Sequence, residues 1–127
     1  MKLLLIDDNL DSLNMLANAL ELMDFECRSY ISPAEAVKAF ITTQFDAVIT
    51  EYMMTGMNGL EVLESLKEIR PDVKVFIYTA YIHEKIYNKA LEKGVSGFFI
   101  KPIDHDCLVE SLEEIESINS QRSMRIS

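Results

Sequence analysis

Four short apolar runs in this chain each end in charged or hydroxyl side chains, and this pattern constrains the fold more than any other feature. The side chains that follow the runs are, in chain order, Asp7 with Asp8, Glu51, Thr79 and Lys101. In a parallel α/β domain the carboxyl ends of the strands meet along one edge, so residues far apart in sequence converge there. The sequence therefore predicts one small pocket that holds acids, a hydroxyl and an ammonium.

Strand and helix patterns alternate from the N-terminus. Residues 3–6 are continuously apolar, as in a strand covered on both faces, whereas residues 25–30 mix polar and apolar side chains and suit an edge strand. Each is followed by a helical pattern, and the second helix opens with Ser32-Pro33-Ala34-Glu35, a predicted capping box. The predicted core faces of these helices are Leu10, Leu13, Leu16, Ala17, Leu20 and Met23, and Ala36, Val37, Phe40 and Ile41.

The cycle repeats three more times. Strands are predicted at residues 47–50, 73–78 and 95–100, and a helix at residues 60–69. We assign residues 1–119 to one domain and the polar segment 120–127 to a tail or the start of a linker. The core faces of the last two helices are predicted to be Ile82, Ile86, Ala90 and Leu91, and Leu108, Val109, Leu112, Ile115 and Ile118.

Five strand–helix units with short connections predict a doubly wound α/β fold with helices on both faces of a parallel sheet. The flavodoxin-like strand order 2-1-3-4-5 fits best, because it buries the strongly apolar strands and leaves the mixed second strand at an edge. Its switch point lies between the first and third strands, which brings Asp7, Asp8 and Glu51 side by side.

Composition restricts the function. The chain has 127 residues, a formal charge of -9 and a pI near 4.6, which oppose direct binding to nucleic acid or to an anionic membrane. No apolar run is long enough to cross a bilayer, and Asp7 interrupts the N-terminal apolar run too early for a signal peptide, so we expect a cytoplasmic protein. Cys27 and Cys107 are interpreted as reduced packing residues.

Three carboxylates at adjacent strand ends repel one another unless a positive charge lies among them. Mg²⁺ suits such a site, because it takes one or two carboxylates and shares its other positions with water or phosphate. Lys101 would supply a mobile point charge to the same phosphoryl group, and Thr79 a hydroxyl that can bond its oxygen. The residue types therefore indicate a phosphoryl-transfer site.

Across residues 2–119 the sequence resembles the receiver domains of two-component response regulators. The matching fragments are the acidic pair Asp7-Asp8, the stretch E-Y-M-M-T-G-M-N-G at 51–59, Thr79-Ala80 and Lys101-Pro102. Each fragment alone is a weak signal, but their order and their positions on the predicted elements make the combination strong.

The resemblance implies Mg²⁺ binding by the acidic pair, by the acceptor position Glu51 and by the backbone carbonyl of Met53. It implies a switch pair, Thr79 and Phe98, that reports phosphorylation to the surface, and a cis peptide bond before Pro102. Such a domain is a signalling module rather than an enzyme. The implied partners are a histidine kinase or phosphotransfer protein and a downstream effector, bound by the fourth helix, fifth strand and fifth helix, a face that could also form a homodimer.

Two positions depart from the family pattern: Glu51 replaces the phosphoacceptor aspartate, and Thr55 replaces a common proline. One added methylene moves the carboxylate by about 1.3 to 1.5 Å, so phosphorylation of Glu51 should be slow or absent. Glu51 either imitates phosphoaspartate or is inert and leaves a domain that works by binding alone. The imitation would be partial, because a glutamate carries one negative charge and a phosphoaspartate carries nearly two. Glu51 could also pair with Lys101 and so weaken Mg²⁺ binding.

Two other classes of protein are alternatives to a receiver domain. A Mg²⁺-dependent phosphatase with an aspartate nucleophile would want a second aspartate two residues after the first, where this chain has Asn9. A flavin-binding flavodoxin-like domain would need a loop rich in Ser, Thr or Gly for its phosphate, where two aspartates would repel it.

Overall fold

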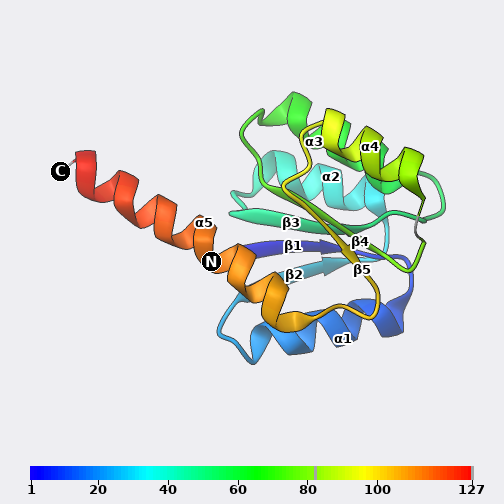
Figure 1. Ribbon diagram of the computed structural model, residues 1–127, viewed down its shortest axis with the longest axis horizontal. Helices are drawn as coiled ribbons and strands as arrows, with labels where there is room; N and C mark the ends of the chain where they lie inside the picture. Colours follow the sequence, from blue (N-terminus) through cyan, green and yellow to red (C-terminus); the bar gives the residue numbers. More distant parts are fainter. Residues whose placement is uncertain (82, 127) are drawn as a thin grey trace.

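A computed structural model describes the backbone of residues 1–81 and 83–126, and the side chains of those residues up to 118. Its sheet has five parallel strands in the order β2-β1-β3-β4-β5, which confirms the predicted flavodoxin-like topology (Figure 1). The strands are β1 (Lys2–Ile6), β2 (Glu26–Tyr30), β3 (Ala47–Glu51), β4 (Val75–Thr79) and β5 (Gly97–Ile100).

Helices cover both faces of the sheet, with α1 and α5 on one side and α2, α3 and α4 on the other (Figure 1). Alternate residues of β1 serve the two layers: Leu3 and Leu5 pack with α1 and α5, whereas Leu4 and Ile6 pack with α2 and α3. The helices are α1 (Leu10–Glu21), α2 (Pro33–Thr42), α3 (Gly59–Ile69), α4 (Glu84–Glu92) and α5 (His105–Ile126).

Burial follows strand position in the sheet. β3 and β4 are buried along their whole length, and four of the five residues of β1 are buried. β2 contains only exposed and partly buried residues, as predicted for an edge strand. The three interior strands therefore provide a rigid base whose carboxyl ends carry the polar residues.

Several residues that the sequence pattern assigned to the core lie largely at the surface. Leu10, Met23, Ile41, Leu91 and Ile118 are each about half exposed or more. In α4 only Ala90 is buried, and the predicted contribution of Ile82 lies outside the described residues. α5 continues to Ile126, through the segment assigned to a tail or linker, and extends beyond the sheet (Figure 1).

The helix caps differ in one respect from the predicted pattern. Ser32 accepts a hydrogen bond from the Glu35 amide, but the Glu35 carboxylate contacts Lys38 at 3.5 Å, and no return bond is recorded for it. The reciprocal capping box lies at the start of α3, between Asn58 and Glu61.

The Lys101–Pro102 peptide bond is cis, as the resemblance implied. Among the described helices, none is long and apolar enough to cross a membrane.

Gly59 lets the start of α3 approach the end of β3. A Cβ atom at this position would lie 2.8 Å from the Glu51 carbonyl oxygen and 2.9 Å from the Tyr52 Cα, and the Gly59 amide donates to the Tyr52 carbonyl at 2.8 Å. Both close atoms belong to the backbone, which cannot give way as a flexible side chain can.

Gly59→Ala should therefore lower the free energy of unfolding by about 1 to 3 kcal/mol, measured by chemical denaturation, because it overpacks this contact. Gly56→Ala is the matched comparison: its Cβ meets nothing within 4 Å, and only its positive φ of 93° is unfavourable. It should cost about 1 kcal/mol. A Gly59→Ala protein as stable as the parent would contradict the close approach.

Candidate functional site

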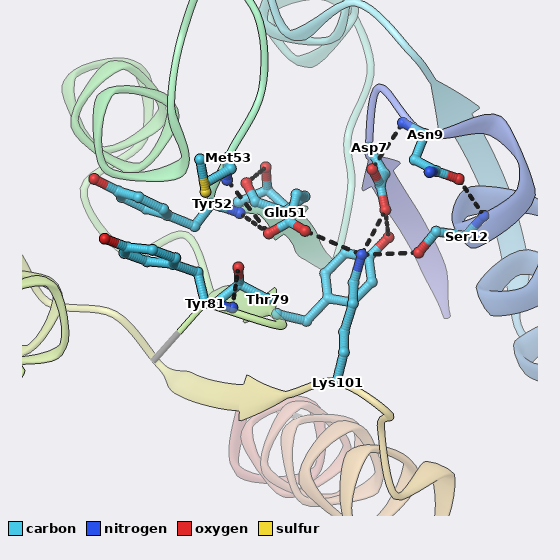
Figure 2. A network of polar contacts seen from close by, with 11 residues as sticks. Asp7, Asn9, Ser12, Glu51, Tyr52, Met53, Thr79, Tyr81 and Lys101 are labelled. Carbon is cyan, nitrogen blue, oxygen red and sulfur yellow. Dashed lines mark hydrogen bonds and ion pairs between the residues drawn. The ribbon is translucent and has the colours of Figure 1, made fainter. Parts of the chain in front are cut away.

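The carboxyl edge of the sheet brings Asp7, Glu51 and Lys101 together, as the topology predicted. The Lys101 ammonium lies 3.1 Å from Asp7 Oδ2 and 3.0 Å from Glu51 Oε1, and so links the ends of β1 and β3 (Figure 2). The Asp7 side chain is 1% exposed and that of Lys101 21% exposed. Because little water reaches these charges, the ammonium is the main compensation for both carboxylates.

Two further groups hold the Lys101 side chain. Its ammonium donates to the hydroxyl of Ser12 in α1 at 2.8 Å, and it lies 4.4 Å from the centre of the Tyr78 ring. The Tyr78 ring thus supports the ammonium through its electron-rich face. The position of Lys101 is therefore fixed by contacts from four elements: the end of β1, β3, β4 and α1.

Tyr78 is a member of the site that sequence reasoning missed. Its phenol, on a residue 1% exposed, donates to Asp7 Oδ2 at 2.5 Å, the short distance typical of a hydrogen bond to a charged carboxylate. Burial, followed by this bond to Asp7, raises the pKa of Tyr78 well above its ordinary value. The signal was present in the sequence, since a tyrosine inside a buried strand needs a partner for its hydroxyl.

The Glu51 side chain bends back toward its own backbone. Its Oε2 accepts hydrogen bonds from the amides of Tyr52 at 2.5 Å and Met53 at 3.3 Å, while Oε1 contacts Lys101 (Figure 2). Glu51 is 8% exposed. The extra methylene therefore leaves a carboxylate that is enclosed by protein donors.

Asp8 stands apart from this network. It is exposed, and its Oδ2 accepts a hydrogen bond from the Thr55 amide at 2.9 Å in the loop after β3. Among the described side chains, no three His, Cys, Asp or Glu residues are grouped so that they could share a metal ion. In this arrangement the predicted ligand set of Asp7, Asp8, Glu51 and the Met53 carbonyl does not fit Mg²⁺, and binding there stays a prediction that requires rearrangement.

The predicted switch residues lie next to the site. Thr79 is buried, and its hydroxyl accepts a hydrogen bond from the Tyr81 amide at 3.1 Å rather than bonding Glu51. Phe98 is partly buried, with its ring edge-on to that of Tyr87 at 5.5 Å. A switch role for Thr79 and Phe98 stays a prediction.

Aromatic rings from two loops stack beside Glu51. The rings of Tyr52 and Tyr81 are nearly parallel with centres 6.5 Å apart, and His83 stacks on Tyr81 at 6.3 Å (Figure 2 shows the two tyrosines). This stack joins the loop after β3 to the loop after β4. His83 also caps α4, because its Nδ1 accepts a hydrogen bond from the Lys85 amide.

A five-stranded 2-1-3-4-5 sheet with acids at β1 and β3, a hydroxyl at β4 and a lysine after β5 defines a receiver-type signalling domain. Comparison with known families agrees: the model of the response regulator receiver domain matches residues 3–113. The chain belongs to this family, whose members are two-component signalling modules rather than conventional enzymes.

Curated relatives include stand-alone and multidomain proteins. Chemotaxis protein CheY of Listeria monocytogenes is 31% identical over 115 residues, which cover 90% of this chain and 97% of CheY. Transcriptional regulatory protein ZraR of Escherichia coli is 29% identical over 112 residues, covering 88% of this chain but 25% of ZraR.

Solved structures share the fold. A response regulator receiver domain protein from Clostridium thermocellum superposes with a TM-score of 0.83 at 26% sequence identity. The superposition covers 97% of this chain and 98% of the Clostridium chain. TrrA from Thermotoga maritima, solved in complex with Mg²⁺ and BeF, gives a TM-score of 0.81 at 25% identity, covering 90% and 97%.

Replacing Lys101 tests whether its ammonium neutralises the pair of carboxylates. Lys101→Met should lower the free energy of unfolding at neutral pH by about 2 to 4 kcal/mol, because it leaves buried charges without compensation. The control is Lys38→Met, whose partner Glu35 is exposed, and which should change stability by less than about 1 kcal/mol. Equal losses in both variants would contradict the assignment.

The raised pKa of Tyr78 predicts how stability depends on alkaline pH. The unfolded chain loses this proton near pH 10 and the folded chain keeps it, so the free energy of unfolding should fall above pH 10. The slope from this group is about 1.4 kcal/mol per pH unit. Tyr78→Phe lacks the group, so its curve, measured by denaturant titration, should be shallower by this amount. Parallel curves for the two proteins would count against the buried phenol.

Proposed function

We propose that this chain is a receiver module of a two-component phosphorelay that works by protein–protein binding, without phosphorylation of residue 51. The observation that carries the proposal is the ion pair between Glu51 Oε1 and Lys101 at 3.0 Å. In this pair the lysine that would contact an incoming phosphoryl group already neutralises the acceptor carboxylate.

The reactivity of Glu51 argues for the same conclusion. A carboxylate that attacks phosphorus must present a free oxygen lone pair in line with the leaving group. Glu51 Oε2 faces the amides of Tyr52 and Met53, and Oε1 faces Lys101. Both oxygens would have to leave these donors before an acyl phosphate could form.

The contacts of Glu51 correspond to only part of what phosphoaspartate would make. Its oxygen reaches Lys101, as a mimic requires, but the Thr79 hydroxyl bonds the Tyr81 amide instead. One carboxylate also carries less charge and fewer acceptor oxygens than an acyl phosphate. These contacts favour a module held in one state over a complete imitation of the phosphorylated form.

The face formed by α4, β5 and α5 is the proposed contact surface for an effector protein or for a second copy. Tyr87, Leu91 and Ile100 on this face are each about half exposed. Tyr87 and Ile100 also line a hollow of about 260 Å³, together with His83, Glu84 and Phe98. A histidine kinase or phosphotransfer protein is the proposed upstream partner, in the cytoplasm. The negative charge of -9 speaks against nucleic acid as a direct partner.

Phosphodonor treatment tests the proposal directly. The protein and its Glu51→Asp variant are incubated with acetyl phosphate and Mg²⁺, and their intact masses are measured. We expect no adduct on the parent and a labile phosphoryl adduct on Glu51→Asp, because the shorter side chain withdraws from Lys101 and regains the reactive position. The same variant without Mg²⁺ serves as control. A phosphoryl group on Glu51 of the parent would overturn the proposal.

A further inference from the structure

We propose that Tyr78 closes this site to divalent cations, because its phenol and the Lys101 ammonium together occupy Asp7 Oδ2, the carboxylate oxygen that a cation bound between Asp7 and Glu51 would need. Tyr78 is then a positioning residue that keeps the site in a metal-free arrangement. This inference rests on the proposed function, because it concerns the same site. It adds the role of one residue, Tyr78, and a cation affinity that can be measured.

The contacts of Asp7 carry the argument. An ionised carboxylate offers about four lone-pair positions on its two oxygens. In Asp7, Oδ2 accepts from the Tyr78 phenol at 2.5 Å and from Lys101 at 3.1 Å, and Oδ1 accepts from the Asn9 amide at 2.9 Å. Three of the positions are therefore taken, and a cation would have to displace a donor to bind Oδ2.

Glu51 is enclosed to the same degree. Its oxygens contact the amides of Tyr52 and Met53 and the ammonium of Lys101. Asp8, the third carboxylate, is exposed and accepts a hydrogen bond from the Thr55 amide. It could offer a cation one ligand, but Asp7 and Glu51 would not supply the others. A divalent cation would meet one available acid and two acids already satisfied by hydrogen-bond donors.

Tyr78 is the contact that cannot simply turn away. Lys101 is on a flexible stem and retains 21% exposure, so its ammonium can move toward solvent when another cation arrives. The Tyr78 ring belongs to the buried cluster on the α1 and α5 side of the sheet, which also contains Phe76 and Leu16. A phenol that left Asp7 would give up a hydrogen bond to a charged carboxylate, which is unfavourable.

Tyr78→Phe is the sharpest test, because it removes only the phenol oxygen and keeps the ring that supports Lys101. Because a cation that binds the variant no longer has to break a hydrogen bond to a charged carboxylate, it should bind at least about tenfold more tightly. Affinity is measured by calorimetric titration with MgCl₂ and by the electron paramagnetic resonance signal of free Mn²⁺. The parent is expected to bind both ions weakly.

Two control variants locate the effect. Tyr87→Phe removes a phenol from α4, where the ring packs against Phe98 and not against Asp7, and should leave the cation affinity at the parent value. Asp7→Asn in the Tyr78→Phe background should abolish the gain, because the released oxygen is then no longer an anion. If circular dichroism shows that Tyr78→Phe does not fold, Tyr78→Met, which also lacks the hydroxyl, is titrated in its place.

Equal affinities of the parent and Tyr78→Phe would overturn the inference, as would a gain that persists after Asp7→Asn. Tight Mg²⁺ binding by the parent itself would overturn it without any variant. These titrations contain no phosphodonor, so they are separate from the test of the proposed function. A phosphoryl adduct on the parent would reject phosphorylation-independent signalling, whereas the cation affinities alone decide the role of Tyr78.

Discussion

The Lys101 ammonium between two buried carboxylates is the interaction on which the arrangement of this site depends. Asp7 and Glu51 lie at the ends of adjacent strands, where the negative charge of each carboxylate disfavours the charged form of the other. A compensating charge must come from a metal ion or from the protein, and here the protein supplies it. Once the ammonium is fixed between them, Tyr78 and the backbone amides after Glu51 complete the hydrogen bonding of both carboxylates.

The parallel sheet makes this convergence possible. Residue Ile6 of β1 pairs with Thr50 of β3, and Glu51 with Tyr78 of β4, so the ends of the three buried strands are in register at one edge. The two helical layers bury the strand interiors on both sides. The strand ends are therefore held by hydrophobic packing that does not depend on the charges, and a polar network can form on a rigid base.

Much of this could be predicted from the sequence, because the strand order follows from apolar patterning and the topology then determines which strand ends meet. The meeting of Asp7, Glu51 and Lys101 is an example. The side-chain contacts could not be predicted in the same way. Glu51 bonds its own following amides, and Thr79 bonds the Tyr81 amide, because nearby backbone donors compete with more distant partners. Spacing along the chain does not determine the outcome of that competition.

The contacts of Glu51 and Thr79 bear on how such a module could communicate with a partner. Glu51 is linked through Lys101 to α1 and to the turn that begins α5, whereas the Thr79 hydroxyl and the Tyr81 ring belong to the loop that leads into α4. No recorded contact joins the Glu51 carboxylate to Thr79 within the described residues. A state imposed by Glu51 would therefore be transmitted first through the α1 and α5 side of the sheet. Transmission to α4 would have to pass through the stacked rings of Tyr52 and Tyr81, which follow Glu51 and Thr79 directly in the chain.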